Sequence, residues 1–138
     1  FLTKEGFSLR CDHNVASAHK TPDFLMRKIE AYEKSGDDLV YITVAGLSDA
    51  LSGIVAGSTR HPVIACPPDS DSIGWPKVYS SVMTPIGIPV LFTSKPENAA
   101  LAAVRILALT NSYLHEELDR YAKAKKEEVI RSDEEIGR

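Results

Sequence analysis

The chain has 138 residues, of which 43% are hydrophobic and 25% are charged, as expected for a single globular domain over residues 1–138. A formal net charge of −3 and a pI near 5.8 exclude a general attraction to nucleic acid, because such binding requires clustered Lys and Arg. No apolar run approaches the roughly 18 residues that a membrane-spanning helix needs. We therefore expect a soluble cytoplasmic protein without a nucleic-acid or membrane partner.

The N-terminal segment predicts the end of a helix followed by a strand. Residues 1–5 resemble the last turn of a helix, and Gly6 is the kind of residue that closes such a turn. Because the chain does not start with Met, we expect the visible sequence to begin inside a domain. Apolar and polar residues then alternate from Phe7 to Cys11, which predicts a half-buried strand.

The rest of the chain alternates strands with helices. Leu39 to Val44 form a nearly unbroken run of β-branched and aromatic residues, which indicates a central parallel strand covered on both faces. Thr21 followed by Pro22 is typical of a helix start, and Ser48 or Asp49 can cap the next helix. The predicted strands are 39–44, 62–66 and 89–93, and the predicted helices are 22–36, 49–58, 77–83, 96–109 and 112–131.

This alternation predicts an α/β fold, built on a doubly wound parallel sheet with an extra C-terminal helix. Ligands of such sheets bind beyond the carboxyl ends of the strands. The mixed charges between Lys123 and Glu135 indicate a solvated helix face, and we assign no chemistry to them. The chemistry is expected in the loops that follow strands, at 13–20, 45–49, 66–75 and 93–98.

The Cys and His residues do not indicate a metal site. Cys11 and Cys66 have neither Cys-x-x-Cys spacing nor a secretory signal, so we expect reduced thiols, with Cys66 at a buried strand end. None of the four His residues has ligand spacing with another His, Cys or acid. The motifs of dinucleotide-binding proteins, nucleoside-triphosphate-binding proteins and serine hydrolases are also missing from the sequence, so these three interpretations have no support.

The loop from Ser17 to Pro22 is the first candidate site. It lies between a predicted strand end and a helix N-terminus, where backbone N–H groups and the Lys20 ammonium can converge on an anion such as a phosphate. A histidine titrates near neutral pH, so His19 could exchange a proton with a substrate. The alternative is that His19 only bonds the backbone of its own loop. The other three His residues lack such surroundings, and His61 and His115 are expected at the surface.

The second candidate site follows the predicted strand 39–44. Ala45 and Gly46 are small, so backbone N–H groups can approach a planar ligand closely, and Ser48 and Asp49 begin the next helix. The alternative for this segment alone is an ordinary tight turn between a strand and a helix.

Three segments together resemble the family of AIR carboxylases and N5-carboxyaminoimidazole ribonucleotide mutases (PurE), where AIR is 5-aminoimidazole ribonucleotide. They are Ser17-Ala18-His19-Lys20-Thr21-Pro22; Ala45-Gly46 with Ser48 to Ser52 and Pro62 to Pro68; and Tyr79-Ser80-Ser81 through Pro85, Gly87 and Ile88 to Asn98-Ala99-Ala100. Their order and spacing cover about residues 7–110. The resemblance implies a three-layer flavodoxin-like fold, no metal or cofactor, and a homo-oligomer, either a tetramer or an octamer.

The details are most similar to the class II branch, which carboxylates AIR directly with CO2 in de novo purine biosynthesis. Lys20 stands where the mutase branch has Arg, and the His-Leu-Pro sequence of that branch is missing. The mutase remains the alternative reaction. A binding protein for phosphosugars or nucleotides, on the same scaffold but without catalysis, is the alternative from another class.

The resemblance also implies roles for the residues of both candidate sites. His19 would remove the proton from the adduct of AIR and CO2, and Lys20 would hold the ribose phosphate. The other residues expected to bind substrate are Ser17, Ala18, Ala45, Gly46, Ser48, Asp49, Ala50 and Leu51. The apolar stripe of the C-terminal helix, at Leu114, Leu118, Tyr121 and Ile130, would pack either on a neighbouring subunit or on its own domain.

The chain differs from the family pattern in several places. The family begins with a strand that ends in a Gly-Ser-x-Ser-Asp loop, and no such sequence precedes Phe1. Because that strand is central in the flavodoxin-like order, we expect an incomplete or disordered start, or else support from another subunit. Single replacements occur near the expected pocket, at Leu47, Asp49, Met83 and Ile86, where the family has Arg, Asn, Arg and Ser.

Overall fold

The computed structural model describes residues 1–68 and 75–137. The elements in chain order are α1 (Pro22–Glu33), β1 (Tyr41–Thr43), α2 (Ala50–Ser58), β2 (Val63–Ala65), α3 (Trp75–Val82), β3 (Leu91–Phe92), α4 (Pro96–Leu107) and α5 (Ser112–Ile136). Each of the later predicted strands and helices is present, although the strands are shorter than expected. The predicted loop at 66–75 lies mostly outside the described residues.

The three strands form one parallel sheet in the order β1-β2-β3. Ile64 in the middle strand lies opposite Ile42 on one side and Leu91 on the other. Helices connect each strand to the next, as parallel pairing requires. The predicted α/β class with a parallel sheet is therefore confirmed.

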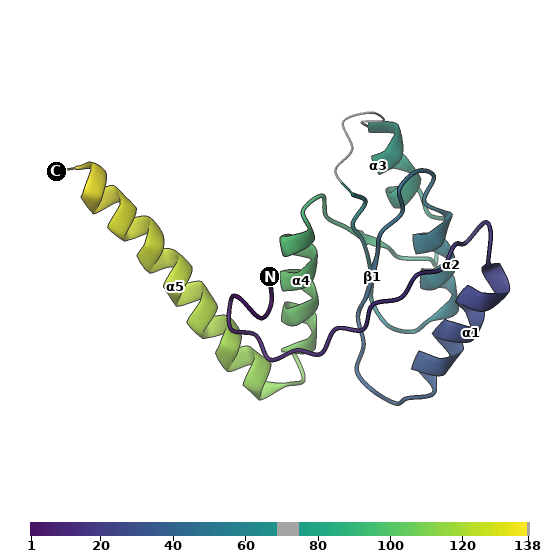
Figure 1. Cartoon of the computed structure of the whole chain (residues 1–138), viewed down its shortest axis with the longest axis horizontal. Helices are drawn as coiled ribbons and strands as arrows, with labels where there is room; N and C mark the ends of the chain where they lie inside the picture. The colour runs from purple at the N-terminus through teal and green to yellow at the C-terminus, as the bar shows by residue number, and fades with distance from the viewer. Residues whose placement is uncertain (69–74, 138) are drawn as a thin grey trace.

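Helices cover both faces of the sheet, so the molecule has three layers. Val63 packs with buried side chains of α1 and α2, whereas the next residue, Ile64, packs with Ala99 and Ala103 of α4. Figure 1 shows α1 and α2 on one side of β1 and α4 on the other. The opposite directions of neighbouring strand side chains thus give each layer its own core.

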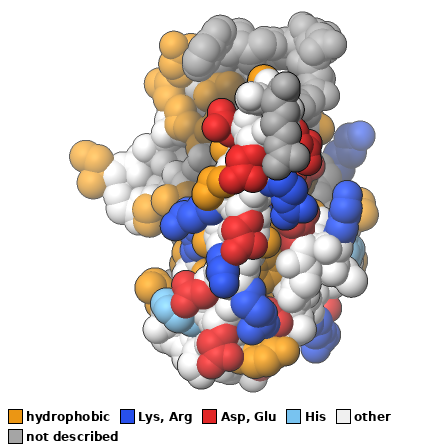
Figure 2. Space-filling model, turned by 90° about the vertical axis from the view of Figure 1, so that its left-hand side faces the viewer, with side chains coloured by type: hydrophobic (Ala, Val, Ile, Leu, Met, Phe, Trp, Pro, Cys, Tyr) orange, Lys and Arg blue, Asp and Glu red, His pale blue; other side chains and the backbone are white. Residues whose placement is uncertain are grey.

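The last helix, α5, begins on the domain and then leaves it. Asn111 caps it by accepting a hydrogen bond from the Leu114 N–H (3.1 Å), and Leu114 is buried. From Ala122 to Gly137 every residue is exposed, and Figure 1 shows this half projecting from the body. Figure 2 shows basic and acidic side chains mixed on this side of the molecule. None of the described helices has the length and apolar character needed to cross a membrane.

The prediction of a strand at 7–11 is wrong. The segment pairs with no strand in the described part of the chain and packs on α5 instead. The ring of buried Phe7 lies 5.4 Å from that of Tyr121, and the Ser8 N–H donates to the Glu117 carboxylate (3.0 Å). Burial fades toward the exposed Cys11. A helix surface therefore explains the apolar alternation that suggested a sheet.

The prediction that 39–44 is a central strand is also wrong for the described residues, and the helices on its two faces cover it only in part. β1 has β2 on one side and no described strand on the other. Ile42 is 42% exposed and Val44 is 58% exposed, although β-branched residues here suggested full burial. Composition reveals strand propensity, but the position of a strand in a sheet depends on its partners.

Away from the carboxyl ends of the strands, Tyr41 lies in a partly buried polar cluster. Its hydroxyl is buried without a hydrogen-bond partner in the described part of the chain. Burial, together with the negative charge of Glu33, raises the pKa of Tyr41 to about 12. Glu33 accepts a hydrogen bond from the Thr59 hydroxyl, which lowers the pKa of that carboxyl.

Tyr41 predicts a loss of stability at alkaline pH. An unfolded tyrosine releases its proton near pH 10, whereas folded Tyr41 keeps it up to about 12. Between these values the folded state binds more protons, so the free energy of unfolding falls as pH rises. The free energy of unfolding, measured with urea, should fall less between about pH 9 and about pH 11 for Tyr41→Phe than for the parent. The exposed Tyr113→Phe should match the parent, and an equal fall in Tyr41→Phe would refute this assignment.

Candidate active site

The two candidate segments lie at the same end of the sheet. The turn before α1 and the loop between β1 and α2 both lie at the upper end in Figure 1, beyond the carboxyl end of β1. Ala18 from the turn and Leu51 from the start of α2 pack on the same buried cluster. A shared core therefore brings together segments that are about thirty residues apart in the sequence.

The turn at 17–21 is closed by reciprocal hydrogen bonds. The Ser17 N–H donates to the Thr21 hydroxyl (2.9 Å), which in turn donates to the Ser17 carbonyl (3.2 Å). The Lys20 N–H donates to the Ser17 hydroxyl (3.1 Å). Thr21 is the residue before α1, as predicted, but its side chain does not cap the helix. The first turn of α1 therefore has backbone N–H groups that no capping side chain occupies.

The turn holds His19 and Lys20 at the surface. Both residues are exposed, and neither side chain forms a hydrogen bond or ion pair with a described residue. The alternative in which His19 bonds the backbone of its own loop is therefore not observed in the described part of the chain. An imidazole, an ammonium group and an uncapped helix N-terminus can act together on an anionic ligand that exchanges a proton.

In the second segment, exposure changes abruptly at one residue. Gly46, Leu47 and Ser48 are exposed, and Ala45 is half-buried, whereas Asp49 is only 6% exposed. Asp49 is the N-cap of α2 and accepts from the Ser52 N–H (2.9 Å), as the sequence predicted for this helix start. Ala50 and Leu51, in the first turn of α2, are half-buried.

The Asp49 carboxylate lies in a buried network of hydroxyl groups. It accepts hydrogen bonds from the Ser52 hydroxyl (2.6 Å) and the Ser81 hydroxyl (2.7 Å). The Ser52 and Thr43 hydroxyl oxygens lie 2.6 Å apart, and the Asp49 N–H donates to the Ser80 hydroxyl (3.0 Å). We name Thr43, Asp49, Ser52, Ser80 and Ser81 the hydroxyl network. It connects β1, α2 and α3.

Sequence reasoning did not place Thr43 in the site, and it recognised Ser52 only as part of the motif at the start of α2. One signal was available, because Asp49 and Ser52 have the spacing at which an N-cap side chain meets a residue three positions later. A second was the hydroxyl of Thr43, which stands in an otherwise apolar strand and must find a partner if buried. Their connection with α3 could not be predicted, because it depends on how three elements pack.

The remaining polar groups at this end support the backbone. The Cys66 N–H donates to the Thr43 carbonyl (2.8 Å), and Cys66 is buried at the strand end, as expected. Lys77 is buried and donates to the Pro68 carbonyl (2.8 Å). The described residues contain no group of three His, Cys, Asp or Glu that could hold a metal ion. The apolar replacements Met83 and Ile86 are both exposed.

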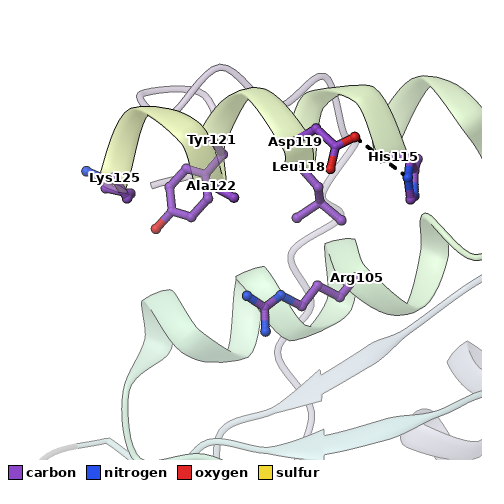
Figure 3. Close-up of a pocket in the computed structure, with 7 residues that line it drawn as sticks. All are labelled: Arg105, His115, Leu118, Asp119, Tyr121, Ala122 and Lys125. Atoms are coloured by element: carbon purple, nitrogen blue, oxygen red, sulfur yellow. Dashed lines mark ion pairs between the residues drawn. The ribbon is translucent and has the colours of Figure 1, made fainter. Parts of the chain in front are cut away.

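An open groove of about 390 Å³ lies elsewhere, where α5 separates from α4. Figure 3 shows Arg105 on α4 facing the α5 residues of the groove. The lining residues are Arg105, His115, Leu118, Asp119, Tyr121, Ala122 and Lys125. His115 lies 3.8 Å from Asp119, but both side chains are largely exposed. The groove contains no residue of either candidate segment.

Comparisons with known proteins agree on one family. The family model described as AIR carboxylase matches residues 2–128. A protein of Archaeoglobus fulgidus named phosphoribosylaminoimidazole carboxylase is 41% identical, over 94% of this chain and 71% of that protein. A protein of Treponema denticola with the same name is 36% identical, over 96% of this chain and 83% of that protein.

Two further similarities concern the reaction and the fold. A protein of Methanocaldococcus jannaschii named N5-carboxyaminoimidazole ribonucleotide mutase is 39% identical, over 94% of this chain and 82% of that protein. The crystal structure of Treponema denticola PurE superposes with a TM-score of 0.92 at 35% identity, over 99% of this chain and 85% of that chain. The predicted three-layer flavodoxin-like fold is consistent with this match.

The turn at 17–21 predicts a local effect of removing one hydroxyl group. In Thr21→Val the Ser17 N–H loses its acceptor, so its hydrogen exchange should become faster, with a stability loss of about 1 kcal/mol. Thr21→Ser keeps the hydroxyl and should exchange like the parent. Amide exchange followed by NMR would measure both variants. Unchanged protection of Ser17 in Thr21→Val would show that the side-chain bond does not hold the turn.

Proposed function

Because the chain belongs to the AIR carboxylase family, we propose that it carboxylates AIR directly with CO2, giving 4-carboxy-AIR in de novo purine biosynthesis. The observation that carries this proposal is the exposed His19, held beside Lys20 by the hydrogen-bonded turn at 17–21. A proton-exchanging group beside a cationic group suits a phosphorylated substrate that must lose one proton.

The proposed reaction needs one carbon–carbon bond and one proton transfer. The aminoimidazole ring is an enamine, so its C4 attacks the carbon of CO2 and the electron pair moves to the new carboxylate. C4 then carries both the carboxylate and its original hydrogen. The His19 imidazole removes this hydrogen as a proton, which restores the aromatic ring. In this mechanism neither ATP nor a biotin group takes part.

The substrate phosphate is proposed to bind at the start of α1. The uncapped N–H groups of its first turn and the Lys20 ammonium supply positive charge there, and Ser17 and Ala18 line the same turn. The exposed loop of Ala45, Gly46 and Ser48, with the α2 start at Asp49, Ala50 and Leu51, would enclose the base and CO2. Excluding water there would keep CO2 close to C4.

The mutase is the second candidate, and one observation favours it: the Methanocaldococcus jannaschii relative carries that name at 39% identity. Direct carboxylation is preferred because Lys20 resembles the direct branch and because the relatives from Archaeoglobus fulgidus and Treponema denticola are both named carboxylase. The two reactions differ in substrate, since the mutase acts on a nucleotide that already carries the carboxylate on nitrogen.

We also propose that the chain folds as a single AIR carboxylase-like domain that works in the cytoplasm as a homo-oligomer. The projecting half of α5 supports association, because it exposes Val129 (70%), Ile130 (59%) and Ile136 (86%). The first half of the predicted stripe, including Leu114, already packs on its own domain. Only the second half, with Ile130, is therefore available to a neighbouring subunit.

The carboxylase proposal predicts that His19→Asn loses turnover. The assay follows the absorbance change when purified protein receives AIR and CO2 without ATP. We expect the parent to turn over and His19→Asn to lose about 100-fold or more in kcat, because a general base contributes this much. His13→Asn, which changes an exposed His outside the turn, should resemble the parent.

The other outcomes of this assay separate the alternatives. A parent that ignores AIR, while the Treponema denticola carboxylase works in the same cuvette, would exclude direct carboxylation. Turnover of N5-carboxyaminoimidazole ribonucleotide alone would indicate the mutase. Binding of either nucleotide without any turnover would indicate a protein that kept the scaffold and lost catalysis.

The oligomer proposal predicts that one charge on α5 weakens association. In Ile130→Asp a carboxylate would have to be buried at the contact, which is costly without a partner. Light scattering after size-exclusion chromatography should show a multimer for the parent and smaller species for Ile130→Asp. Ser132→Asp adds the same charge two residues away and should assemble more like the parent. A monomeric parent at micromolar concentration would refute the proposal.

A further inference from the structure

We propose that Asp49 is a positioning residue, and that its carboxylate holds the loop 44–48 in place without touching the substrate. This inference rests on the proposed function and deepens it, because it changes the role expected for Asp49 from substrate binding to loop placement. It also gives a role to Thr43, Ser80 and Ser81, and a more specific role to Ser52, which the sequence placed only in the motif at the start of α2.

The protein itself occupies the hydrogen-bonding capacity of the carboxylate. Asp49 Oδ1 accepts from the Ser52 N–H (2.9 Å), while Oδ2 accepts from the Ser52 hydroxyl (2.6 Å) and the Ser81 hydroxyl (2.7 Å). A carboxylate has about four acceptor positions, so three of them are filled here. With only 6% of the residue exposed, little of Asp49 remains for a ligand.

The carboxylate also fixes the direction of the hydrogen bonds around it. An ionised carboxylate can only accept, so the single hydroxyl hydrogen of Ser52 points toward Asp49. The Thr43 hydroxyl, 2.6 Å from the Ser52 oxygen and 3.4 Å from the Ile64 carbonyl oxygen, is then the donor to the nearer Ser52 oxygen. Thr43 therefore donates to Ser52, and Ser52 donates to Asp49. This order makes the connection between β1 and α2 depend on the acceptor at position 49.

The loop 44–48 has both of its ends in this network. Thr43 immediately precedes the loop and Asp49 immediately follows it, and both are buried. The far side of the network is α3, where Ser81 donates to the carboxylate and Ser80 accepts from the Asp49 N–H (3.0 Å). The end of β1, the start of α2 and α3 thus hold the two ends of the loop that carries the exposed residues Gly46 and Ser48.

His19 is not part of the network, so binding and proton transfer should respond differently to its disruption. The turn at 17–21 closes through its own hydrogen bonds. A disordered loop 44–48 would weaken the enclosure of the base, while the proton-transferring group would keep its place. We therefore expect variants of the network to raise KM for AIR much more than they lower kcat.

Ser81→Ala is the sharpest test, because Ser81 is fully buried and cannot touch a ligand. We expect faster amide exchange in the loop 44–48 and a KM for AIR raised by roughly tenfold or more, with kcat within about threefold of the parent. Ser58→Ala removes a hydroxyl from the opposite end of α2, so it should leave the amide exchange of the loop and the KM for AIR unchanged. Thermal unfolding of each variant shows whether it remains folded.

Substitutions of Asp49 itself complete the experiment. Asp49→Ala should show the same rise in loop exchange and in KM. Asp49→Asn should restore most of the affinity, because its amide oxygen can still accept from Ser52 and its NH₂ group can donate to hydroxyls that reverse their direction. If Ser81→Ala does not fold, Ser80→Ala replaces it, since it removes the acceptor of the Asp49 N–H together with a bond to the Lys77 carbonyl within α3 and leaves the carboxylate contacts intact.

Two results would overturn the inference: parent-like exchange of the loop 44–48 in Ser81→Ala and Asp49→Ala, or a kcat loss in Ser81→Ala without a KM change. Failure of the proposed function is a separate result. A parent that does not convert AIR refutes the carboxylase, whereas the exchange measurement needs no substrate and still decides whether the network holds the loop.

Discussion

The complete burial of β2 is the constraint on which both helical layers depend. Val63, Ile64 and Ala65 are each at most 2% exposed, and the first two face opposite layers. Burying a Val or Ile side chain contributes roughly 1.5–3 kcal/mol, so one short strand anchors α1 and α2 on one face and α4 on the other. Because the strands are parallel, this anchoring also places the carboxyl ends of β1 and β2 at the same edge.

At that edge the hydrogen bonds of the sheet continue into the hydroxyl network. The Cys66 N–H donates to the Thr43 carbonyl (2.8 Å), and the Thr43 hydroxyl leads through Ser52 to Asp49. A buried hydroxyl left without a partner would cost about 1–3 kcal/mol, so the bonds to Asp49 stabilise the buried hydroxyls of Ser52 and Ser81. The end of the sheet and the start of α2 are therefore placed together, and the exposed loop between them is placed with them.

Local signals in the sequence were sufficient for most of the elements. Pro22 after Thr21 indicated the start of α1, and the β-branched run at 39–44 indicated β1. The prediction of a strand at 7–11 failed because apolar alternation is equally compatible with packing on a helix, here on Tyr121 of α5. The prediction of a central position for β1 failed for a similar reason, since the sequence of one strand does not determine which distant strands pair with it.

The candidate site shows the same division between local and distant information. The fold leaves the side chains of His19 and Lys20 without a partner among the described residues, so both are available to a ligand. Rules of burial do not select such residues, whereas the position of their loop before a helix N-terminus, together with the motif, pointed to them. Asp49 is the opposite case, because the capping rule predicted its position correctly.

What the capping rule could not predict is where the second oxygen of Asp49 points. That oxygen meets Ser81, which lies on α3 and is distant in the sequence. An expected contact with substrate thus becomes an internal contact once α3 is in place. The role of a polar residue beside an active site depends on the partners that the fold gives it. Residues of one motif can therefore have different roles, some reacting with the substrate and others holding the loop that encloses it.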